Sequence, residues 1–452
     1  MKTYQDLMEI RANERETIEF CLDAIREHEG SEVYKTAVLA EEYDRMQNPT
    51  IREYKKMLTT MLGTKVEDKW SANYKVISGF FHRFVVQENS YLLGNGMMLE
   101  KDKNKEKLGG DFDMRLMQAG KNALVHGAAY GFYDNGRVKV FKLTEFVPLY
   151  DEENGSIRAG VRYWRIDAAK PLRFTLYEED GFTEYIKKKD EDAKILREKR
   201  KYIQIVKSSE VDGTEIYDYS NYPGFPIIPL YANHYKQSTL VGLQEGIDCY
   251  DLIKSGFANT VDEASIVYWV VKNSGGMSDV DLAKFKERIK SVNVASVDAD
   301  EGGGAEAHTI DVPYEAREKL LERLKKDLYE DAMALDVEQI AAGNVTATQI
   351  EASYEPLNQK TDEFEACVLD FLEELFKIVG IEDEPKFNRS RISNQLETTQ
   401  TVLMAAQYLD TETILSKLPW LTQEEAAKVL ERLTAEDVER FSNSEGVNGF
   451  EA

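Results

Sequence analysis

Two aspartates in the string GGDFD, Asp111 and Asp113, come closest to a catalytic pattern in this sequence. Two carboxylates one residue apart lie on the same face of a β-strand, where they can hold divalent metal ions against phosphates, as in a nucleotidyltransferase. That chemistry needs a strand that continues after the pair and a third acid farther along the chain. The residues that follow, MRLMQAGKNALVHG, instead indicate a helix, of which Asp111 is the expected N-terminal cap. A nucleotidyltransferase-like enzyme therefore stays only as an alternative.

Other catalytic and metal-binding patterns are absent from the sequence. It contains no phosphate-binding GxxxxGK[ST] loop, no GxSxG and no HExxH. The cysteines, Cys21, Cys249 and Cys367, lie more than 100 residues apart, and the five histidines are equally scattered, so neither set has zinc-ligand spacing. We expect no catalysis, no cofactor and no bound metal, with the cysteines as buried free thiols.

The chain is strongly acidic. Its 57 Lys and Arg against 82 Asp and Glu give a net charge of −25. A protein that grips nucleic acid over a broad surface uses Lys and Arg to displace counterions from phosphates, so this class is disfavoured. An acidic wall repels the duplex and suits a conduit past which DNA slides.

Two basic clusters interrupt the acidic sequence. One covers residues 101–107; the other comprises residues 187–189, Lys194 and residues 197–201. Both are diluted by acids or polar residues and lack interleaved aromatics, so we interpret them as solvated loops or hairpin tips rather than DNA sites.

The length and hydropathy indicate a folded protein. At 452 residues and 42% hydrophobic residues, the chain can form about two to four packed regions. It has no run of about 18 apolar residues, and its first residues, MKTYQDLMEIRANERE, lack the apolar run of a signal peptide. We expect a protein that is made and used in the cytoplasm.

The first half of the chain combines helices with a β region. Apolar positions at steps of three and four predict helices over residues 4–60, 71–92 and 113–130, with turns near residues 29–31 and 48–49. Between Gly136 and Pro229, alternating runs such as VKVFKL, FVPLYD, RFTLYE and YIQIVK are separated by turn residues. This pattern predicts an antiparallel meander.

Two long helices that flank a small insert are predicted next. Residues 242–264 are apolar along one face and contain no proline. The second helix begins at Pro313 and continues to about Leu335, a span of roughly 35 Å at about 1.5 Å per residue. Between them, strand formers at residues 265–273, a short helix at 279–291 and strands near 292–297 and 305–312 indicate a small α/β insert.

The C-terminal part is predicted to be helical. A third long helix covers residues 349–379, and shorter ones cover residues 396–409, 411–418 and 422–433. The tail after Phe441, SNSEGVNGFEA, has the composition of a disordered segment.

The helix from Pro313 carries both signs of charge. Such a pattern usually means a solvated face, and that interpretation stays open beside a face that exchanges ion pairs with a neighbouring copy while attracting DNA little. The charged residues are Arg317, Lys319, Arg323, Lys325 and Lys326, alternating with Glu315, Glu318, Glu322, Asp327, Glu330 and Asp331.

Three segments carry a resemblance to a known family. FVPLYDEENGSIRAGVRYWRID (residues 146–167) forms part of the meander, and NHYKQSTLVGLQEGIDCYDLIKSGFANTVDEA (233–264) has a polar loop and then a D-x-Y-D-x-x-x-S core at Asp248, Tyr250, Asp251 and Ser255. YLDTETILSKLPWLTQEEAAKVLERLTAE (408–436) places a short helix before Leu418-Pro419 and an acidic final helix. In this order, over nearly the whole chain, they resemble the portal proteins of tailed double-stranded DNA bacteriophages, especially those of long, flexible-tailed phages.

The resemblance implies an α+β fold that is mainly α, with a wing, a helical stem, a small α/β clip and a helical crown. The implied regions are the wing (1–240), the first stem helix (241–264), the clip (265–312), the second stem helix (313–335), the tunnel loop (336–348), a long helix with its connector (349–393), the crown (394–441) and a disordered tail (442–452).

The resemblance also implies a function and partners. About twelve copies would form a ring at one capsid vertex, through which double-stranded DNA is packaged, retained and ejected. The clip would dock the terminase large subunit and later the head-completion, adaptor or tail proteins, and the ring would meet the major capsid and scaffold proteins. No membrane is implied, and the protein would reach the virion after assembly in the host cytoplasm.

Candidate site residues follow from the implied regions. The tunnel segment is short and acidic or neutral, which fits weak contact with sliding phosphates. It departs from many relatives at NVTATQI (344–350), where they carry a Ser-Gly-x-Ala step. A different head or tail adaptor of the virion is the other alternative, but it would lack the stem, clip and tunnel order. The candidates are Asp336, Glu338, Gln339, Gly343, Asn344 and Thr346 in the tunnel loop, Glu318, Glu322, Lys325 and Lys326 facing the channel from the stem, and Trp269, Lys284 and Lys286 for docking at the clip.

Overall fold

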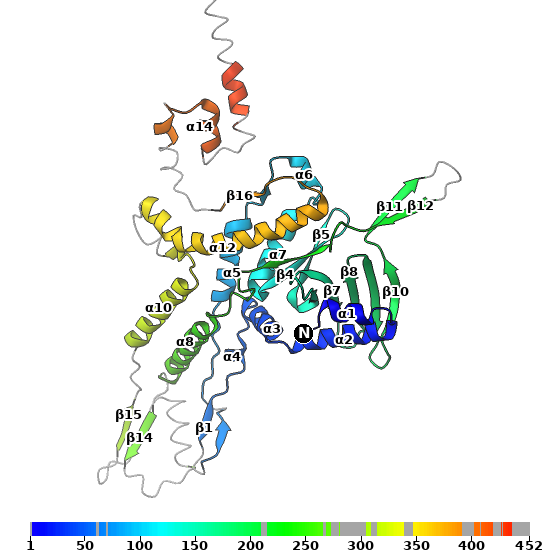
Figure 1. The fold of residues 1–452 in the computed structure, drawn as a ribbon. Coiled ribbons are helices and arrows are strands. Elements are labelled where there is room, and N and C mark those ends of the chain that lie inside the picture. The colour runs from blue at the N-terminus through cyan, green and yellow to red at the C-terminus, as the bar shows by residue number, and fades with distance from the viewer. Residues whose placement is uncertain are drawn as a thin grey trace, which may run out of the picture. The chain divides into compact units, whose positions relative to one another are not determined.

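The structure, a computed structural model, divides into two units (Figure 1). Unit 1 comprises residues 1–334 and 360–388, and unit 2 comprises residues 335–359 and 389–452. None of the described helices is both long and apolar enough to span a membrane. The structure describes residues 2–59, 63–68, 71–208, 215–264, 268–272, 280, 304–308, 314–338, 347–390, 402–406, 408–418, 426 and 428–435.

Side-chain caps begin the first helices. The Thr3 hydroxyl accepts the amide of Asp6, whose carboxylate accepts the amide of Thr3 in return. Asn13 and Ser31 cap the next two helices in the same way, which satisfies amides that a helix leaves without partners. These helices are α1 (Tyr4–Ile10), α2 (Glu14–Gly30), α3 (Glu32–Asp44) and α4 (Pro49–Arg52).

A five-stranded antiparallel sheet follows the expected meander. Its order is β10-β9-β8-β7-β6, and α1 and α2 bury their apolar residues against it. Phe174 and Tyr185 are opposite each other in the register and stack with their ring centroids 4.9 Å apart. The strands are β6 (Phe146–Tyr150), β7 (Ile157–Trp164), β8 (Leu172–Glu178), β9 (Gly181–Lys187) and β10 (Lys194–Arg200).

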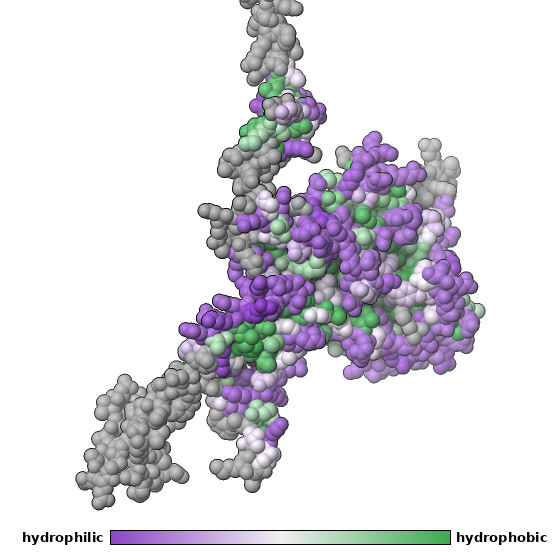
Figure 2. All heavy atoms as spheres, turned by 60° about the vertical axis from the view of Figure 1, so that its left-hand side comes forward, coloured by the Kyte–Doolittle hydropathy of each residue, from purple (hydrophilic) through white to green (hydrophobic). Residues whose placement is uncertain are grey.

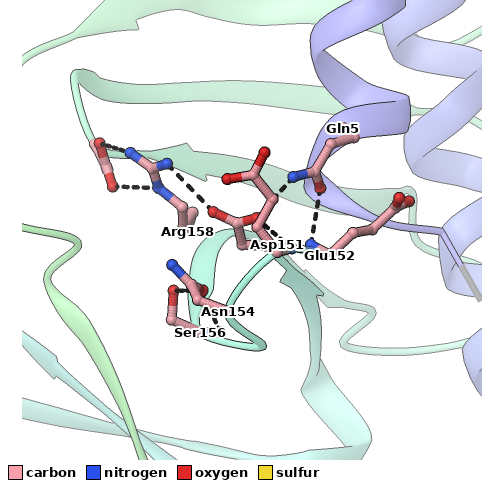
Figure 3. A network of polar contacts seen from close by, with 8 residues as sticks. Gln5, Asp151, Glu152, Asn154, Ser156 and Arg158 are labelled. Atoms are coloured by element: carbon pink, nitrogen blue, oxygen red, sulfur yellow. Dashed lines mark hydrogen bonds and ion pairs between the residues drawn. The ribbon is translucent and has the colours of Figure 1, made fainter.

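A polar network fastens α1 to the turn between β6 and β7 (Figure 3). Gln5 donates from Nε2 to Asp151 at 2.7 Å and accepts the amide of Glu152 at 3.1 Å. Arg158 donates to the same Asp151 at 3.3 Å and to Glu179 at 2.9 Å. The first helix is thereby held to the sheet by side chains about 150 residues away in sequence.

A second layer joins a three-stranded sheet to the main core. The order β13-β4-β5 is antiparallel and packs against α7, and a Cβ at Gly131 of β4 would lie 2.7 Å from Phe371 of α12. These elements are α5 (Phe80–Leu93), α7 (Phe112–His126), β4 (Ala128–Tyr133), β5 (Val138–Lys142), the 3₁₀ turn η1 (Leu143–Glu145), β13 (Ile227–Tyr231) and α12 (Ala347–Val379).

The remaining elements of unit 1 are small two-stranded sheets, the short helix α6 and the two long helices. The pairs β1 with β2, β11 with β12, β14 with β15 and β3 with β16 are each antiparallel. The bounds are β1 (Met57–Thr59), β2 (Lys65–Glu67), β3 (Met97–Met98), α6 (Asp102–Glu106), β11 (Ile203–Ser208), β12 (Glu215–Ser220), α8 (Gln244–Ala264), β14 (Tyr268–Lys272), β15 (Gly304–His308), α10 (Tyr314–Asp331) and β16 (Lys386–Phe387).

Unit 2 contains residues 347–359 of α12 and the short helix α14 (Thr411–Lys417). The Asp410 side chain caps α14 by accepting the amide of Thr413 at 3.0 Å. A small core of Val402, Leu415, Leu418 and Ala426 holds these C-terminal residues together.

The α+β prediction, with helices and antiparallel sheets, is confirmed, but several boundaries were wrong. Residues 57–59 form a strand, and residues 71–79 are not helical. The helix expected to Tyr130 ends at Gly127, whose φ of 92° is the left-handed conformation that glycine tolerates. The helix from Pro313 ends at Asp331, just before Met333 with φ of 49°.

Two other predictions also need correction. Residues 194–200 of the second basic cluster form the edge strand β10 rather than a loop, and Arg200 there pairs with Glu184 of β9 at 2.5 Å. Residues 102–106 form α6. Cys21 and Cys367 are buried free thiols, as expected, but Cys249 is exposed. The predicted helix at 279–291, the strand near 292–297 and the tail after Phe441 lie outside the described residues, except for Val280.

Candidate channel-forming helices

The two long helices, α8 and α10, form an antiparallel pair (Figure 1). Near one end, Arg317 donates to the Thr260 hydroxyl at 2.7 Å, and near the other, a Cβ on Gly246 would lie 2.9 Å from Leu328. The absence of a side chain at Gly246 lets the helices approach closely at that end. The two helices therefore contact each other near both ends of the pair.

Aromatic residues attach this pair to α5. Tyr250 of α8 meets Phe80 edge to face at 4.9 Å, and Tyr329 of α10 meets Phe84 at 5.3 Å. The Tyr329 hydroxyl also accepts a hydrogen bond from Arg83 at 2.6 Å. Edge-to-face pairs add about 0.5–1.5 kcal/mol each beyond their buried area. One end of the helix pair is therefore held to α5 by an aromatic cluster.

An extended segment, residues 71–79, lies along α8, and we name it the strap. Alternate strap amides of Tyr74, Val76 and Ser78 donate to side chains spaced four residues apart on α8. Two extended residues advance about 6.6 Å and four helical residues about 6.0 Å, so the two spacings match. The acceptors are Asn259 at 2.6 Å, Ser255 at 2.9 Å and Asp251 at 2.9 Å.

A second set of bonds joins Asp248 of α8 to the region of α3 and α4. The Asp248 carboxylate accepts from the Tyr43 hydroxyl at 2.5 Å, from Asn48 at 2.8 Å and from Thr50 at 3.0 Å. Asn48 also donates to Asp251, which is fully buried and whose pKa is raised by that burial. Three of the four residues in the D-x-Y-D-x-x-x-S core, Asp248, Asp251 and Ser255, therefore bind the N-terminal segment, and the fourth, Tyr250, binds α5.

The charged surface of α10 is nearly balanced. Five basic and six acidic residues give Tyr314–Asp331 a net charge of −1. Arg323 pairs with Asp327 at 2.8 Å and Lys326 with Glu330 at 3.4 Å, each one turn apart. This helix therefore offers DNA neither a strong attraction nor a strong repulsion.

The four predicted stem residues lie within an arc of about 100° around α10, because successive helical residues turn by about 100°. Lys326 is exposed on the side away from α8, whereas Lys325 is half-buried and acts electrostatically on Tyr250 of α8. Glu318 and Glu322 are exposed on a flank between these two directions, and no described residue forms an ion pair with them. Which of the four face a channel remains a prediction.

The other predicted site residues are only partly described. Asp336 accepts the amide of Glu338 at 3.1 Å, which forms a local turn after α10. Trp269 belongs to β14, opposite Ala307 of β15, so a strand pair exists where the clip was expected. Gln339, Gly343, Asn344, Thr346, Lys284 and Lys286 lie outside the described residues.

The GGDFD aspartates are not arranged for metal-dependent transfer. Asp111 precedes α7 and Asp113 lies in its first turn, so no strand carries them. Asp111 stands at the N-cap position, but its side chain accepts from Arg115 at 3.1 Å instead of capping the helix. Asp113 accepts from Lys105 at 2.7 Å and from the Met97 amide at 3.1 Å. The described residues include no cluster of three metal-ligand side chains.

Comparison with known families shows to which family the chain belongs. The model of the family described as "Phage portal protein, SPP1 Gp6-like" matches residues 34–439. The chain belongs to this phage portal protein family. As a portal protein it is a structural protein of phage particles, and the portal family matched here is not an enzyme family.

Two relatives carry the same name. The portal protein of Clostridium phage phiCD119 is 23% identical over 419 residues, which cover 83% of this chain and 88% of the relative. The portal protein of Bacillus phage SPP1 is 23% identical over 421 residues, covering 82% and 78%. The similarity therefore extends over most of both portal proteins rather than one shared segment.

Solved structures of gene transfer agent particles are also similar. A chain of the native virion matches at 11% identity with a TM-score of 0.42, covering 74% of this portal protein and 88% of that chain. A chain from the neck of the empty particle matches at 9% identity with a TM-score of 0.44, covering 75% and 90%.

Proposed function

We propose that about twelve copies of this portal protein form a ring at one capsid vertex, with the α8/α10 pairs side by side around a DNA channel. The antiparallel pair, held to the rest of unit 1 by the aromatic cluster and the strap, is the observation that carries this proposal. DNA would enter, stay and leave through this channel without catalysis by the ring.

Within this ring, the face of α10 that carries Lys326 borders the channel, with Glu318 and Glu322 at its margin. The tunnel loop of residues 336–348 forms the constriction, and the strand pair β14/β15 belongs to the clip that docks the terminase large subunit and later the head-completion or adaptor proteins. The major capsid and scaffold proteins surround the ring, which assembles in the host cytoplasm and stays in the virion.

Electron microscopy of the purified protein tests the ring. Class averages viewed along the symmetry axis are expected to show twelve-fold or thirteen-fold rings with an open centre. A monodisperse monomer at micromolar concentration would contradict the proposal.

A further inference from the structure

A groove runs between the strap and the α8/α10 pair. It encloses about 510 Å³ and is lined by Tyr54 after α4, by Tyr74 and Lys75 of the strap, by Leu252 of α8, and by Arg317 and Leu320 of α10. All of these residues belong to unit 1. The groove exists because the strap is held to α8 by its polar ladder and so stands beside the helices as a second wall.

The rim of the groove is formed by large apolar and aromatic side chains that are exposed to solvent. Tyr54, Tyr74, Leu252 and Leu320 are 45%, 53%, 45% and 46% exposed, although all four are large hydrophobic or aromatic residues. Figure 2, turned so that the α8 and α10 side of Figure 1 comes forward, shows hydrophobic surface beside a hydrophilic band. Adjoining apolar residues of this size mark interaction sites on soluble proteins.

The groove also carries positive charge without acidic partners. Arg317 donates to the Thr260 hydroxyl and Lys75 to the carbonyl of Arg52, and among the described residues neither forms an ion pair with a carboxylate. A partner for this groove therefore needs an apolar ridge and carboxylates beside it.

The opposite flank of the same helix pair has these properties. Successive helical residues turn by about 100°, so Glu318 and Glu322 both lie about 160° around α10 from Leu320. On α8, Val261 lies about 180° from Leu252 and is 44% exposed. Both helices thus present the groove on one side, and an apolar residue with two carboxylates on the other.

The carboxylates on that flank are available for pairing. No described residue forms an ion pair with Glu318 or Glu322. Of the two lysines nearest this flank, Lys254 lies 5.6 Å above the Tyr250 ring, and the charge of Lys325 also acts on Tyr250.

We propose that the groove of one copy receives the opposite flank of the α8/α10 pair of the next copy, so that Glu318 and Glu322 meet Arg317 and Lys75 while Val261 enters the apolar rim. The partner is a second copy of this chain, and the contact rests on the ring proposed above. Because the two surfaces differ, the contact is head to tail, and repetition of such a contact closes a ring.

Two variants that damage different sides of this contact provide the test. Leu320→Asp places a negative charge in the apolar rim of the groove and leaves the flank intact. Glu318→Arg with Glu322→Arg reverses the charge of the flank and leaves the groove intact. All three residues are exposed, so both variants should fold, which circular dichroism and the thermal midpoint check. Lys319→Glu, on α10 between the two sides, is the matched control for a charge reversal.

Sedimentation velocity and native mass spectrometry give the outcome. Each variant alone should associate at least about ten-fold more weakly than the wild-type chain and run as a monomer, whereas the Lys319→Glu control should form rings. A 1:1 mixture of the two variants should form heterodimers, because the intact flank of the Leu320→Asp variant can bind the intact groove of the double variant. Assembly should stop there, since the groove and the flank left over in the heterodimer are the two mutated ones.

The contrary outcomes are distinct. If the wild-type chain forms rings and either variant does so equally well, or if the mixture stays monomeric, the groove does not hold the neighbouring copy. If the wild-type chain itself stays monomeric, the ring is wrong and this contact with it.

Discussion

At the scale of single residues, Glu41 joins three elements through its charge. It lies on α3, with His126 Nε2 of α7 at 3.8 Å and Lys142 Nζ of β5 at 2.7 Å. His126, and then Lys142, hold the pKa of the Glu41 carboxyl well below its usual range, against the burial that raises it. The carboxylate therefore stabilises the fold only while it is ionised.

Replacement of Glu41 by Gln should lower the free energy of unfolding at pH 7 by about 1.5–3 kcal/mol, because a charge-assisted contact is lost. Since the folded-state pKa is depressed, this contribution is present above the usual value of 4.5 and disappears as the pH falls through the folded-state pKa. Urea unfolding at pH 7 and at successively lower pH should show the two proteins converging. Glu19→Gln, at an exposed pair, should differ little from wild type at any pH.

At Gly120, the lack of space for a side chain determines which residue the fold tolerates. A Cβ there would lie 2.4 Å from Asn89 Oδ1 of α5 and 3.2 Å from Phe364 of α12. Gly120→Ala should lower stability by about 1–3 kcal/mol despite the better helix propensity of alanine. Thermal melts are the measurement, with Gly30→Ala, where no atom lies within 4 Å, as a control that should be neutral.

At the scale of elements, the strap depends on side chains of α8 for its backbone hydrogen bonds. Ser255→Ala and Asn259→Ala each remove one acceptor worth about 1 kcal/mol, so the amides of Val76 and Tyr74 respectively should exchange about five-fold faster. Hydrogen exchange measured by mass spectrometry over residues 71–79 tests this. Lys254→Ala, which removes no acceptor, should leave the exchange unchanged; equal effects from all three variants would contradict the ladder.

The strap also shows where sequence-based prediction reached its limit. Its apolar positions at steps of three and four predicted a helix from residue 71, but the helix starts at Phe80. The residues before it stay extended because side chains of α8 accept the amides of Tyr74, Val76 and Ser78. A long-range interaction of this kind leaves no local pattern. The long helices α8 and α12, by contrast, were predicted within a few residues because their apolar stripes continue for many turns.

Two strands, β10 and β4, were missed for a different reason. Residues 194–200 read as a charged cluster because an edge strand with both faces exposed needs no hydrophobic alternation. Ala128–Tyr133 is buried on both faces and so has no alternation either. Of the candidate site, the sequence located the two long helices but not the strap or the groove, since both arise from contacts between distant segments.

At the scale of the whole molecule, the net charge of −25 bears on how the proposed ring would meet DNA. Lys and Arg are widely paired with acids, as in Arg158 with Glu179 and Arg200 with Glu184. We expect the protein to bind a short linear duplex with a dissociation constant weaker than about 10⁻⁴ M at physiological salt. Fluorescence anisotropy measures this, and micromolar affinity with a steep salt dependence would contradict it.

The direction of the strap ladder has a mechanical consequence. Its three hydrogen bonds succeed one another along α8, so a force parallel to that helix loads them together in shear, whereas a force across it would break them one at a time from an end. A thrust along the helix axis is thus shared among the three bonds and passed to α5, which begins at Phe80 directly after the strap. In the proposed ring, with α8 running along the channel, DNA moving through it would load the strap in the direction in which its three bonds act together.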